Sequence, residues 1–167
     1  MTTQVVDIPV SVLRTGRMTA PDLTGLDLPD VFPPAGTYLS AVLHHDVLHT
    51  AGHIPLGADG TLVTGRLGDS LTVEEGALAA RLAALSLLAT VQEELGSLDR
   101  VDRFLYVYGV VNATPEFTAH TTVIDGASDV FVQVFGDRGR HARLAVGVPS
   151  LPADLAVEVQ ATIAVHP

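Results

Sequence analysis

The chain has 167 residues, the length of one ordinary domain, and its composition excludes several chemistries at once. It contains no cysteine, and all nine of its basic residues are arginine, so lysine is absent. Schiff-base and phosphate-loop lysines, thiolate nucleophiles, disulfides and cysteine-ligated metals are therefore ruled out. A formal net charge of -10 disfavours binding to nucleic acid or to an anionic membrane.

Hydrophobic residues make up 47% of the chain and charged residues 17%, so it is more apolar than a typical domain. The longest apolar run, residues 77–91, contains Arg81 and is too short to cross a bilayer. The N-terminus lacks the basic start of a secretory signal. We therefore expect a cytoplasmic protein whose surplus apolar residues lie in a core and in a subunit interface.

The first part of the chain predicts an irregular lead-in, because prolines, aspartates and glycines gather over residues 14–37. We assign this lead-in to residues 1–32 and the folded domain to residues 33–167. Short apolar runs follow, and they predict strands. A hairpin is expected from residues 38–43 and 47–51, and a further short strand from residues 61–64.

The first helix is predicted between Thr72, which begins a capping box with Glu75, and Gly96. Downstream, the pattern predicts a central strand that is apolar on both faces, a second helix ending at Gly136, and two final strands. These elements are expected at residues 101–111, 122–135, 141–148 and 155–165. The order predicts an α+β fold with two helices on one face of a mixed sheet. Another subunit is the simplest cover for the other face.

Alternation in the last two strands places Arg143 and Glu158 each among small or polar neighbours. If these strands pair antiparallel, the two side chains lie nearly opposite one another and share a face. Such a pair fits either a plain cross-strand salt bridge or a guanidinium fork that binds a substrate carboxylate. Both interpretations remain open from the pattern alone.

Other familiar sites are poorly supported by the sequence. The histidines at 44, 45, 49 and 53 are closely spaced, but they follow a strand pattern, so we expect no metal site. Ser128 lies in the second predicted helix and outside any nucleophile-elbow motif, so we expect no nucleophilic serine. No glycine-rich nucleotide fingerprint follows a strand, and no cofactor is expected.

Three segments together resemble the RidA (YjgF/YER057c/UK114) family. They are Ala-Gly-His-Ile-Pro at residues 51–55, Asp-Gly-Thr-Leu-Val-Thr-Gly at 59–65, and the ending in which Arg143 precedes Leu-Pro at 151–152 and Val-Glu-Val at 157–159. The resemblance runs from about residue 33 to residue 165. The longer lead-in and the Gly-Arg-His-Ala-Arg segment at 139–143 are similar to a less characterised branch of that family.

The resemblance implies a chorismate-mutase-like ββαβαββ fold, assembled as a homotrimer with three sites in the clefts between subunits. It also implies cofactor-free hydrolysis of reactive enamines and imines, such as 2-aminoacrylate, to a 2-oxo acid and ammonia. Carried over to this chain, Arg143 binds the substrate carboxylate and Glu158 helps to position water, so these two are the expected catalytic residues. Tyr38 matches the tyrosine of the cleft, and Gly52 the backbone beside the substrate.

Four expected substrate-binding positions depart from the family pattern. Ala51 replaces a serine, His53 a glutamine, Asp125 an asparagine and Ala145 a cysteine. His53 could serve as an acid or base, or only support its neighbours.

Three functions therefore stay open. The leading one is deamination of a small carboxylated imine. The alternatives are a non-catalytic trimer that binds carboxylated metabolites such as 2-oxo acids, and a pathway-specific enzyme for a larger imine or carbonyl intermediate, for which Ala51 leaves room. The charge of -10 disfavours a ribonuclease.

Overall fold

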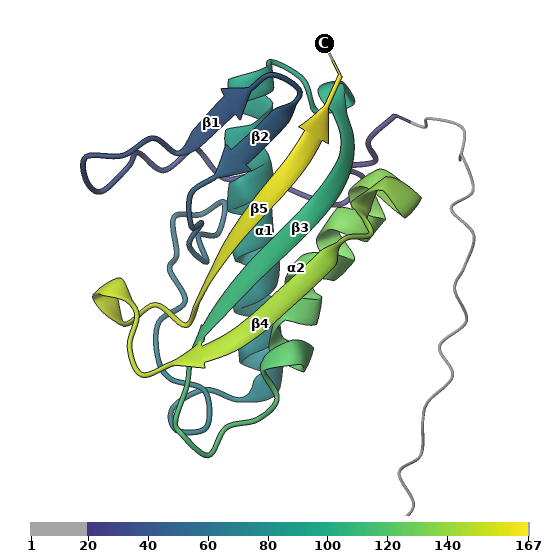
Figure 1. Ribbon diagram of the computed structural model, residues 1–167. Coiled ribbons are helices and arrows are strands. Elements are labelled where there is room, and N and C mark those ends of the chain that lie inside the picture. The colour runs from purple at the N-terminus through teal and green to yellow at the C-terminus, as the bar shows by residue number, and fades with distance from the viewer. Residues whose placement is uncertain (1–19, 167) are drawn as a thin grey trace, which may run out of the picture.

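The computed structural model describes residues 20–166, in which five strands form one mixed sheet covered on one face by two helices (Figure 1). The strand order is β1-β2-β5-β3-β4. The strands are β1 (Ala41–His44), β2 (Val47–Thr50), β3 (Val101–Asn112), β4 (Ala142–Val148) and β5 (Val157–Val165). The helices are α1 (Val73–Leu95) and α2 (His120–Phe135), with short 3-10 turns η1 (Leu98–Arg100), η2 (Gly136–Gly139) and η3 (Pro152–Asp154). The predicted α+β order is confirmed.

Helix α1 begins and ends where its capping residues predict. The Thr72 hydroxyl accepts from the backbone N–H of Glu75, and the Glu75 carboxylate accepts from the backbone N–H of Thr72. Gly96 adopts a φ of 75°, the left-handed conformation that ends a helix at little cost only for glycine. Both ends of α1 are therefore fixed by local chemistry, independently of the packing around it.

The core lies between the helices and the sheet. Phe104 of β3 stacks on Phe131 of α2 with ring centroids 4.3 Å apart, and Phe135 adds a tilted contact at 5.4 Å. Alternate residues of β5 face the helices and are buried, as are Val107 and Val111 of β3. The side chains between them in the two strands therefore point to the open face of the sheet.

The pairing expected between residues 141–148 and 155–165 is wrong, because β3 lies between these strands. β4 pairs parallel to β3, and β5 pairs antiparallel to the other edge of β3. The physical reason is the crossover through α2, which returns the chain in the same direction and makes β3 and β4 a parallel pair. β5 then fills the position between β2 and β3.

As a result, Arg143 and Glu158 do not share a face. Arg143 is opposite the buried Val107 and points toward α2, whereas Glu158 is opposite Val110 and points to the open face. Neither the cross-strand salt bridge nor a shared site within one subunit forms between them, and the ion pair of Arg143 is with Asp125.

Two further expectations concern the connecting segments. Residues 61–64 do not form a strand and make only isolated bridges, such as the one between Thr64 and Leu155. Of the lead-in expected at 1–32, residues 1–19 lie outside the described part of the chain; residues 20–40 contain no helix or strand, although Leu26 is buried in the core. None of the described helices is long and apolar enough to span a membrane.

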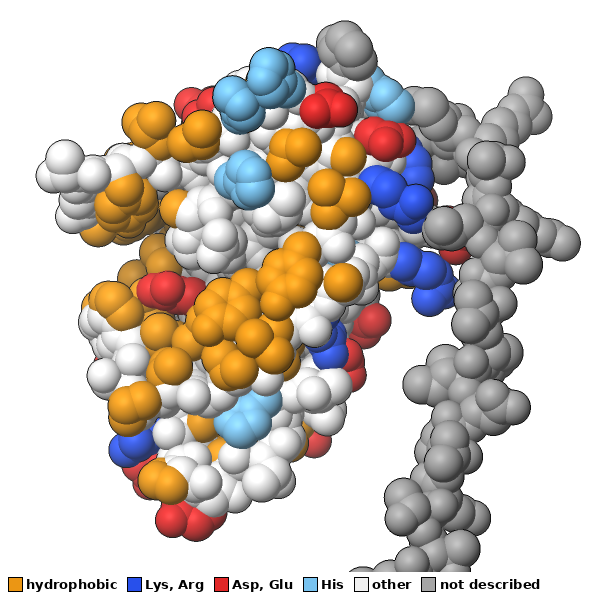
Figure 2. Space-filling model, viewed as in Figure 1, with side chains coloured by type: hydrophobic (Ala, Val, Ile, Leu, Met, Phe, Trp, Pro, Cys, Tyr) orange, Lys and Arg blue, Asp and Glu red, His pale blue; other side chains and the backbone are white. Residues whose placement is uncertain are grey.

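The open face of the sheet carries an apolar patch, visible near the centre of the molecule in Figure 2. Tyr106 of β3 and Leu144 of β4 point to this face and keep 40% and 46% of their surface exposed. Val42 of β1 points to the same face and is 49% exposed. Apolar side chains that gather on one face mark a surface for association.

The close contact of the two helices gives a stability prediction. A Cβ added at Gly126 of α2 would collide with the Ala77 carbonyl of α1. Alanine favours a helix by up to about 1 kcal/mol over glycine, but overpacking against rigid backbone costs about 1–3 kcal/mol or more, so the clash wins. Gly126→Ala should lower the free energy of unfolding in urea. Gly36→Ala, where the nearest atom is 3.4 Å away, should change it little, and equal stabilities of the two variants would contradict this packing.

Candidate functional site

The predicted site residues divide between two cavities. A cavity of about 560 Å³ lies where the chain leaves β2 and passes β5, and its lining includes Tyr38, Ala51, Gly52, His53 and Glu158. A second cavity of about 530 Å³ lies between α2 and the edge strand β4. Its lining includes the other three predicted residues, Asp125, Arg143 and Ala145. The structure thus groups these residues as five and three.

Glu158 is the one acidic side chain among the described residues that line the first cavity. It is half-buried, and this burial raises the pKa of its carboxyl group above the ordinary value. Within residues 20–166 it forms no hydrogen bond or ion pair. A Cβ at Gly52 would lie 2.9 Å from Glu158 Oε2, so glycine at this position leaves the carboxylate its space.

His53 is buried beside the same cavity, and both of its ring nitrogens are engaged. Nδ1 lies 3.0 Å from the carbonyl oxygen of Ala51, so Nδ1 must donate, and Nε2 then accepts from the Thr90 hydroxyl at 2.9 Å. Desolvation lowers the pKa of His53 to about 4, so the ring is neutral at pH 7. This geometry suits a group that fixes the backbone at Ala51 better than one that exchanges protons with a ligand.

The remaining wall of the first cavity is mostly apolar. Tyr38 is exposed at the rim, and its hydroxyl accepts a hydrogen bond from the backbone N–H of Ala35 at 3.2 Å. Residues such as Pro33, Ile54 and Leu62 complete the wall. A carboxyl group among mostly apolar side chains favours its protonated form more than an exposed carboxyl group does.

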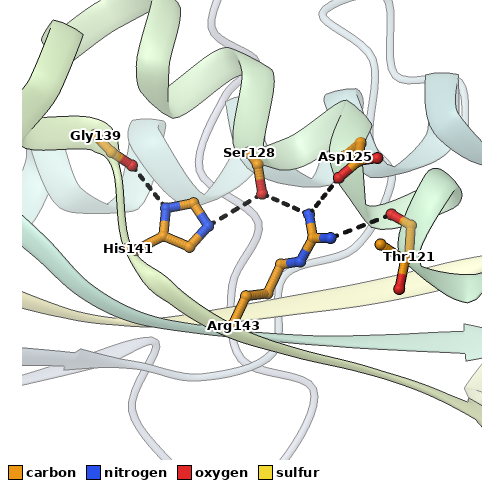
Figure 3. Close-up of polar contacts among 6 residues, drawn as sticks. All are labelled: Thr121, Asp125, Ser128, Gly139, His141 and Arg143. Atoms are coloured by element: carbon orange, nitrogen blue, oxygen red, sulfur yellow. Dashed lines mark hydrogen bonds and ion pairs between the residues drawn. The ribbon is translucent and has the colours of Figure 1, made fainter. Parts of the chain in front are cut away.

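Arg143 organises the second cavity through three contacts with α2 (Figure 3). Its Nη1 donates to Asp125 Oδ1 at 2.8 Å and to Ser128 Oγ at 2.8 Å, and its Nη2 donates to the carbonyl oxygen of Thr121 at 3.3 Å. Three of the five guanidinium hydrogens are therefore used. Within residues 20–166, the Nε hydrogen and the second Nη2 hydrogen have no acceptor.

Asp125 and Ala145 shape the surroundings of this guanidinium. The side chain of Arg143 is 17% exposed and that of Asp125 is 53% exposed, so Asp125 forms the solvent side of the ion pair. Ala145 follows Arg143 on the same face of β4 and adds no polar group beside it. The arginine is thus partly neutralised and firmly oriented before any ligand arrives.

A contact that the sequence did not predict connects α2 with the residue before β4. Ser128 Oγ lies 3.0 Å from His141 Nε2, and His141 Nδ1 lies 2.6 Å from the carbonyl oxygen of Gly139 (Figure 3). Ser128 and His141 share no local motif, because they belong to a helix and a strand end that only the crossover brings together. The only signal in the sequence is periodicity, which places Ser128 on one face of the helix and His141 on the same face of its strand as Arg143.

Comparisons with known proteins agree with this architecture. Residues 17–161 match the family model described as "YjgF/chorismate mutase-like, putative endoribonuclease". Protein TCP17 of Trypanosoma cruzi is 45% identical over 156 residues, which cover 92% of this chain and 98% of that protein.

Solved structures of related proteins have the same fold. The crystal structure of Atu1372 from Agrobacterium tumefaciens, a protein of unknown function, superposes with a TM-score of 0.79 at 35% identity, covering 86% of this chain and 89% of that one. A Shewanella oneidensis protein described as a putative endoribonuclease gives a TM-score of 0.82 at 33% identity, with coverage of 85% and 94%.

The buried state of His53 predicts a pH-dependent stability. Its pKa of about 4 lies below the ordinary 6.5, so the unfolded chain binds the proton first and stability is lost as the pH falls from about 6.5 through 4. The loss is on the order of 3 kcal/mol. Denaturant unfolding of His53→Gln, compared with the parent chain across this window, should show a shallower decline. Parallel declines in the two proteins would contradict the assignment.

Proposed function

Because the chain belongs to the YjgF/chorismate mutase-like family, we propose that it hydrolyses a small carboxylated imine or enamine to a 2-oxo acid and ammonia without a cofactor. The fold of the family is the one described above, with two helices on one face of a mixed five-stranded sheet. The reaction itself is the proposal, and the geometry of Arg143 is the observation that carries it.

The contacts of Arg143 support its proposed role in binding a substrate carboxylate. Three hydrogen bonds to α2 fix the guanidinium, while two of its hydrogens remain available in a cavity. A guanidinium with two available N–H groups binds a carboxylate through paired, charge-assisted hydrogen bonds. Because the side chain is already ordered, little conformational entropy is lost when a ligand binds.

Glu158 supplies a group that can hold or accept a proton. Burial raises the pKa of its carboxyl group, which makes it a stronger proton acceptor than an exposed glutamate. The apolar walls of its cavity limit competing hydrogen bonds. Since an imine carbon is already electrophilic, orienting the substrate and one water molecule is the main catalytic requirement.

The reaction requires no other group. A proton added to the β-carbon converts an enamine to its imine, and water then adds to the imine carbon. The carbinolamine loses ammonia as the C–N bond breaks and the carbonyl forms. Arg143 binds the carboxylate throughout, and Glu158 transfers protons between water and the substrate.

A homotrimer would bring the Arg143 cavity of one subunit next to the Glu158 cavity of another. Arg143 and Glu158 point to opposite faces of the sheet within one subunit, so a site that uses both needs a second subunit. The apolar patch at Tyr106 and Leu144 supports such an association, because a neighbouring chain would bury it. Each cleft would then join the Arg143 cavity of one subunit to the Glu158 cavity of the next.

The endoribonuclease in the family description receives less support from this chain. A net charge of -10 repels a phosphate backbone. Within residues 20–166, no basic patch lines either cavity, since the second cavity contains two arginines and two aspartates. Imine hydrolysis is therefore the reaction that we favour.

Replacing the proposed carboxylate ligand tests this function. The Arg143→Ala variant should lower kcat/KM by about a hundredfold or more, since removing one member of a buried charge pair costs about 2–5 kcal/mol. The assay measures ammonia release, above the buffer rate, from enamines generated in situ from serine or threonine. Equal rates for the variant and the parent would refute the proposal.

Arg140 provides the matched control. Its side chain lies at the rim of the same cavity, is 72% exposed and pairs with Asp137. Arg140→Ala removes one positive charge but leaves the guanidinium of Arg143 in place. The activity of this variant should therefore stay close to that of the parent chain. A thermal shift by 2-oxo acids that depends on Arg143, with no turnover in any protein, would contradict the deaminase and favour the non-catalytic binder.

A further inference from the structure

The hydroxyl of Ser128 lies between a histidine and an arginine in the second cavity (Figure 3). Its Oγ is 3.0 Å from His141 Nε2 and 2.8 Å from Arg143 Nη1. His141 Nδ1 is in turn 2.6 Å from the carbonyl oxygen of Gly139. A nucleophile within reach of a base, and a base oriented by a third group, is the arrangement that activates serine in enzymes.

The proton positions in this chain of contacts follow from the partners. The Gly139 carbonyl can only accept, so His141 Nδ1 carries a hydrogen and donates it. In the neutral ring, Nε2 is then an acceptor, and the Ser128 hydroxyl must donate to it. Arg143 can only donate, so it donates to a lone pair of the same oxygen. Ser128 is therefore set to lose its proton to His141.

The surroundings keep His141 neutral and in place. The rings of Phe131 and Phe104 lie 5.8 Å and 6.3 Å from the imidazole, and Phe131 contacts it edge-on. Desolvation, followed by the charge of Arg143, lowers the pKa of His141 below its ordinary value, against the effect of the Gly139 hydrogen bond. At pH 7 the ring is thus available as a general base.

Arg143 stabilises negative charge on the oxygen of Ser128. Its Nη1 hydrogen bond stabilises an alkoxide on Ser128. Nη2 makes one hydrogen bond to the described residues, so its second hydrogen is available to an oxyanion that develops on a carbonyl attacked by Oγ. The cavity of about 530 Å³ leaves room for a small acyl group beside these three side chains.

We propose that Ser128 is the nucleophile of a second activity, acyl transfer from a short activated ester or thioester. Oγ forms a bond to the acyl carbon, the bond from that carbon to the leaving oxygen or sulfur breaks, and the Ser128 proton passes through His141 Nε2 to the leaving group. Water then attacks the acyl-serine with His141 again as the base. This activity differs from imine hydrolysis, which requires neither Ser128 as a nucleophile nor a covalent intermediate, although both reactions use Arg143.

The test uses p-nitrophenyl acetate as the probe. The absence of lysine and cysteine removes two common competing nucleophiles, which makes an acetylated serine easier to identify. We expect nitrophenolate release with one acetyl group on Ser128, located by peptide mass spectrometry of the parent protein. Ser128→Ala should abolish this labelling, and His141→Gln should slow it by about a hundredfold or more. As the pH is lowered, the acetylation rate should begin to decrease at a pH below the ordinary pKa of histidine, because the pKa of His141 is lowered.

Ser150 is the matched control, since it is exposed and has no hydrogen bond to the described residues. Ser150→Ala should acetylate like the parent chain. A parent protein without an acetyl group on Ser128, or equal rates in the parent and in His141→Gln, would overturn the proposal. Because the mapping uses the parent protein, the proposal stays testable even if Ser128→Ala fails to fold.

Discussion

The central position of β3 determines on which face of the sheet Arg143 and Glu158 lie. Its parallel pairing with β4 places Arg143 on the helix side at the level of Val107. Its antiparallel pairing with β5 places Glu158 on the other face at the level of Val110. A one-residue change in either register would turn one of these side chains to the opposite face. The separation of the two candidate groups is therefore a consequence of backbone pairing, which side-chain rearrangement cannot reverse.

The two cavities are built on different electrostatic principles. The first places a single carboxyl group, Glu158, among apolar side chains, where burial favours its protonated form. The second holds its guanidinium with Asp125, Ser128 and a backbone carbonyl, so that charge is compensated and direction is fixed. The proposed imine hydrolysis uses both features, a carboxyl group with a raised pKa in one cavity and an oriented cation in the other. Acyl transfer at Ser128 would use the second cavity alone.

Local signals in the sequence predicted both helices and all five strands, but they did not predict the strand pairing, and they wrongly predicted a further strand at residues 61–64. The capping box at Thr72 and the left-handed Gly96 fix α1 through contacts within a few residues. The apolar faces of 101–111 correctly predicted a central strand, which needs a neighbour on each side. The expected hairpin of the last two strands is wrong, because the crossover through α2 places β4 on one side of β3 and β5 pairs with the other side.

The candidate site was predicted in the same uneven way. Motif resemblance found residues that the structure groups into two cavities, including Arg143 and Glu158. The resemblance could not reveal the contact between Ser128 and His141, because this contact depends on how α2 packs against the start of β4. The sequence also could not decide whether His53 is an acid or base or only supports its neighbours, since this depends on a hydrogen bond to Thr90 in α1.

A site shared between subunits is tested most directly by mixing two inactive variants. Arg143→Ala and Glu158→Gln are each expected to be nearly inactive alone, but a mixed trimer can contain a cleft with Arg143 from one subunit and Glu158 from its neighbour. Random assembly from equal amounts should leave about one cleft in four with both residues, so imine hydrolysis should return to about a quarter of the parent rate. A mixture no more active than its separate components would contradict the shared site.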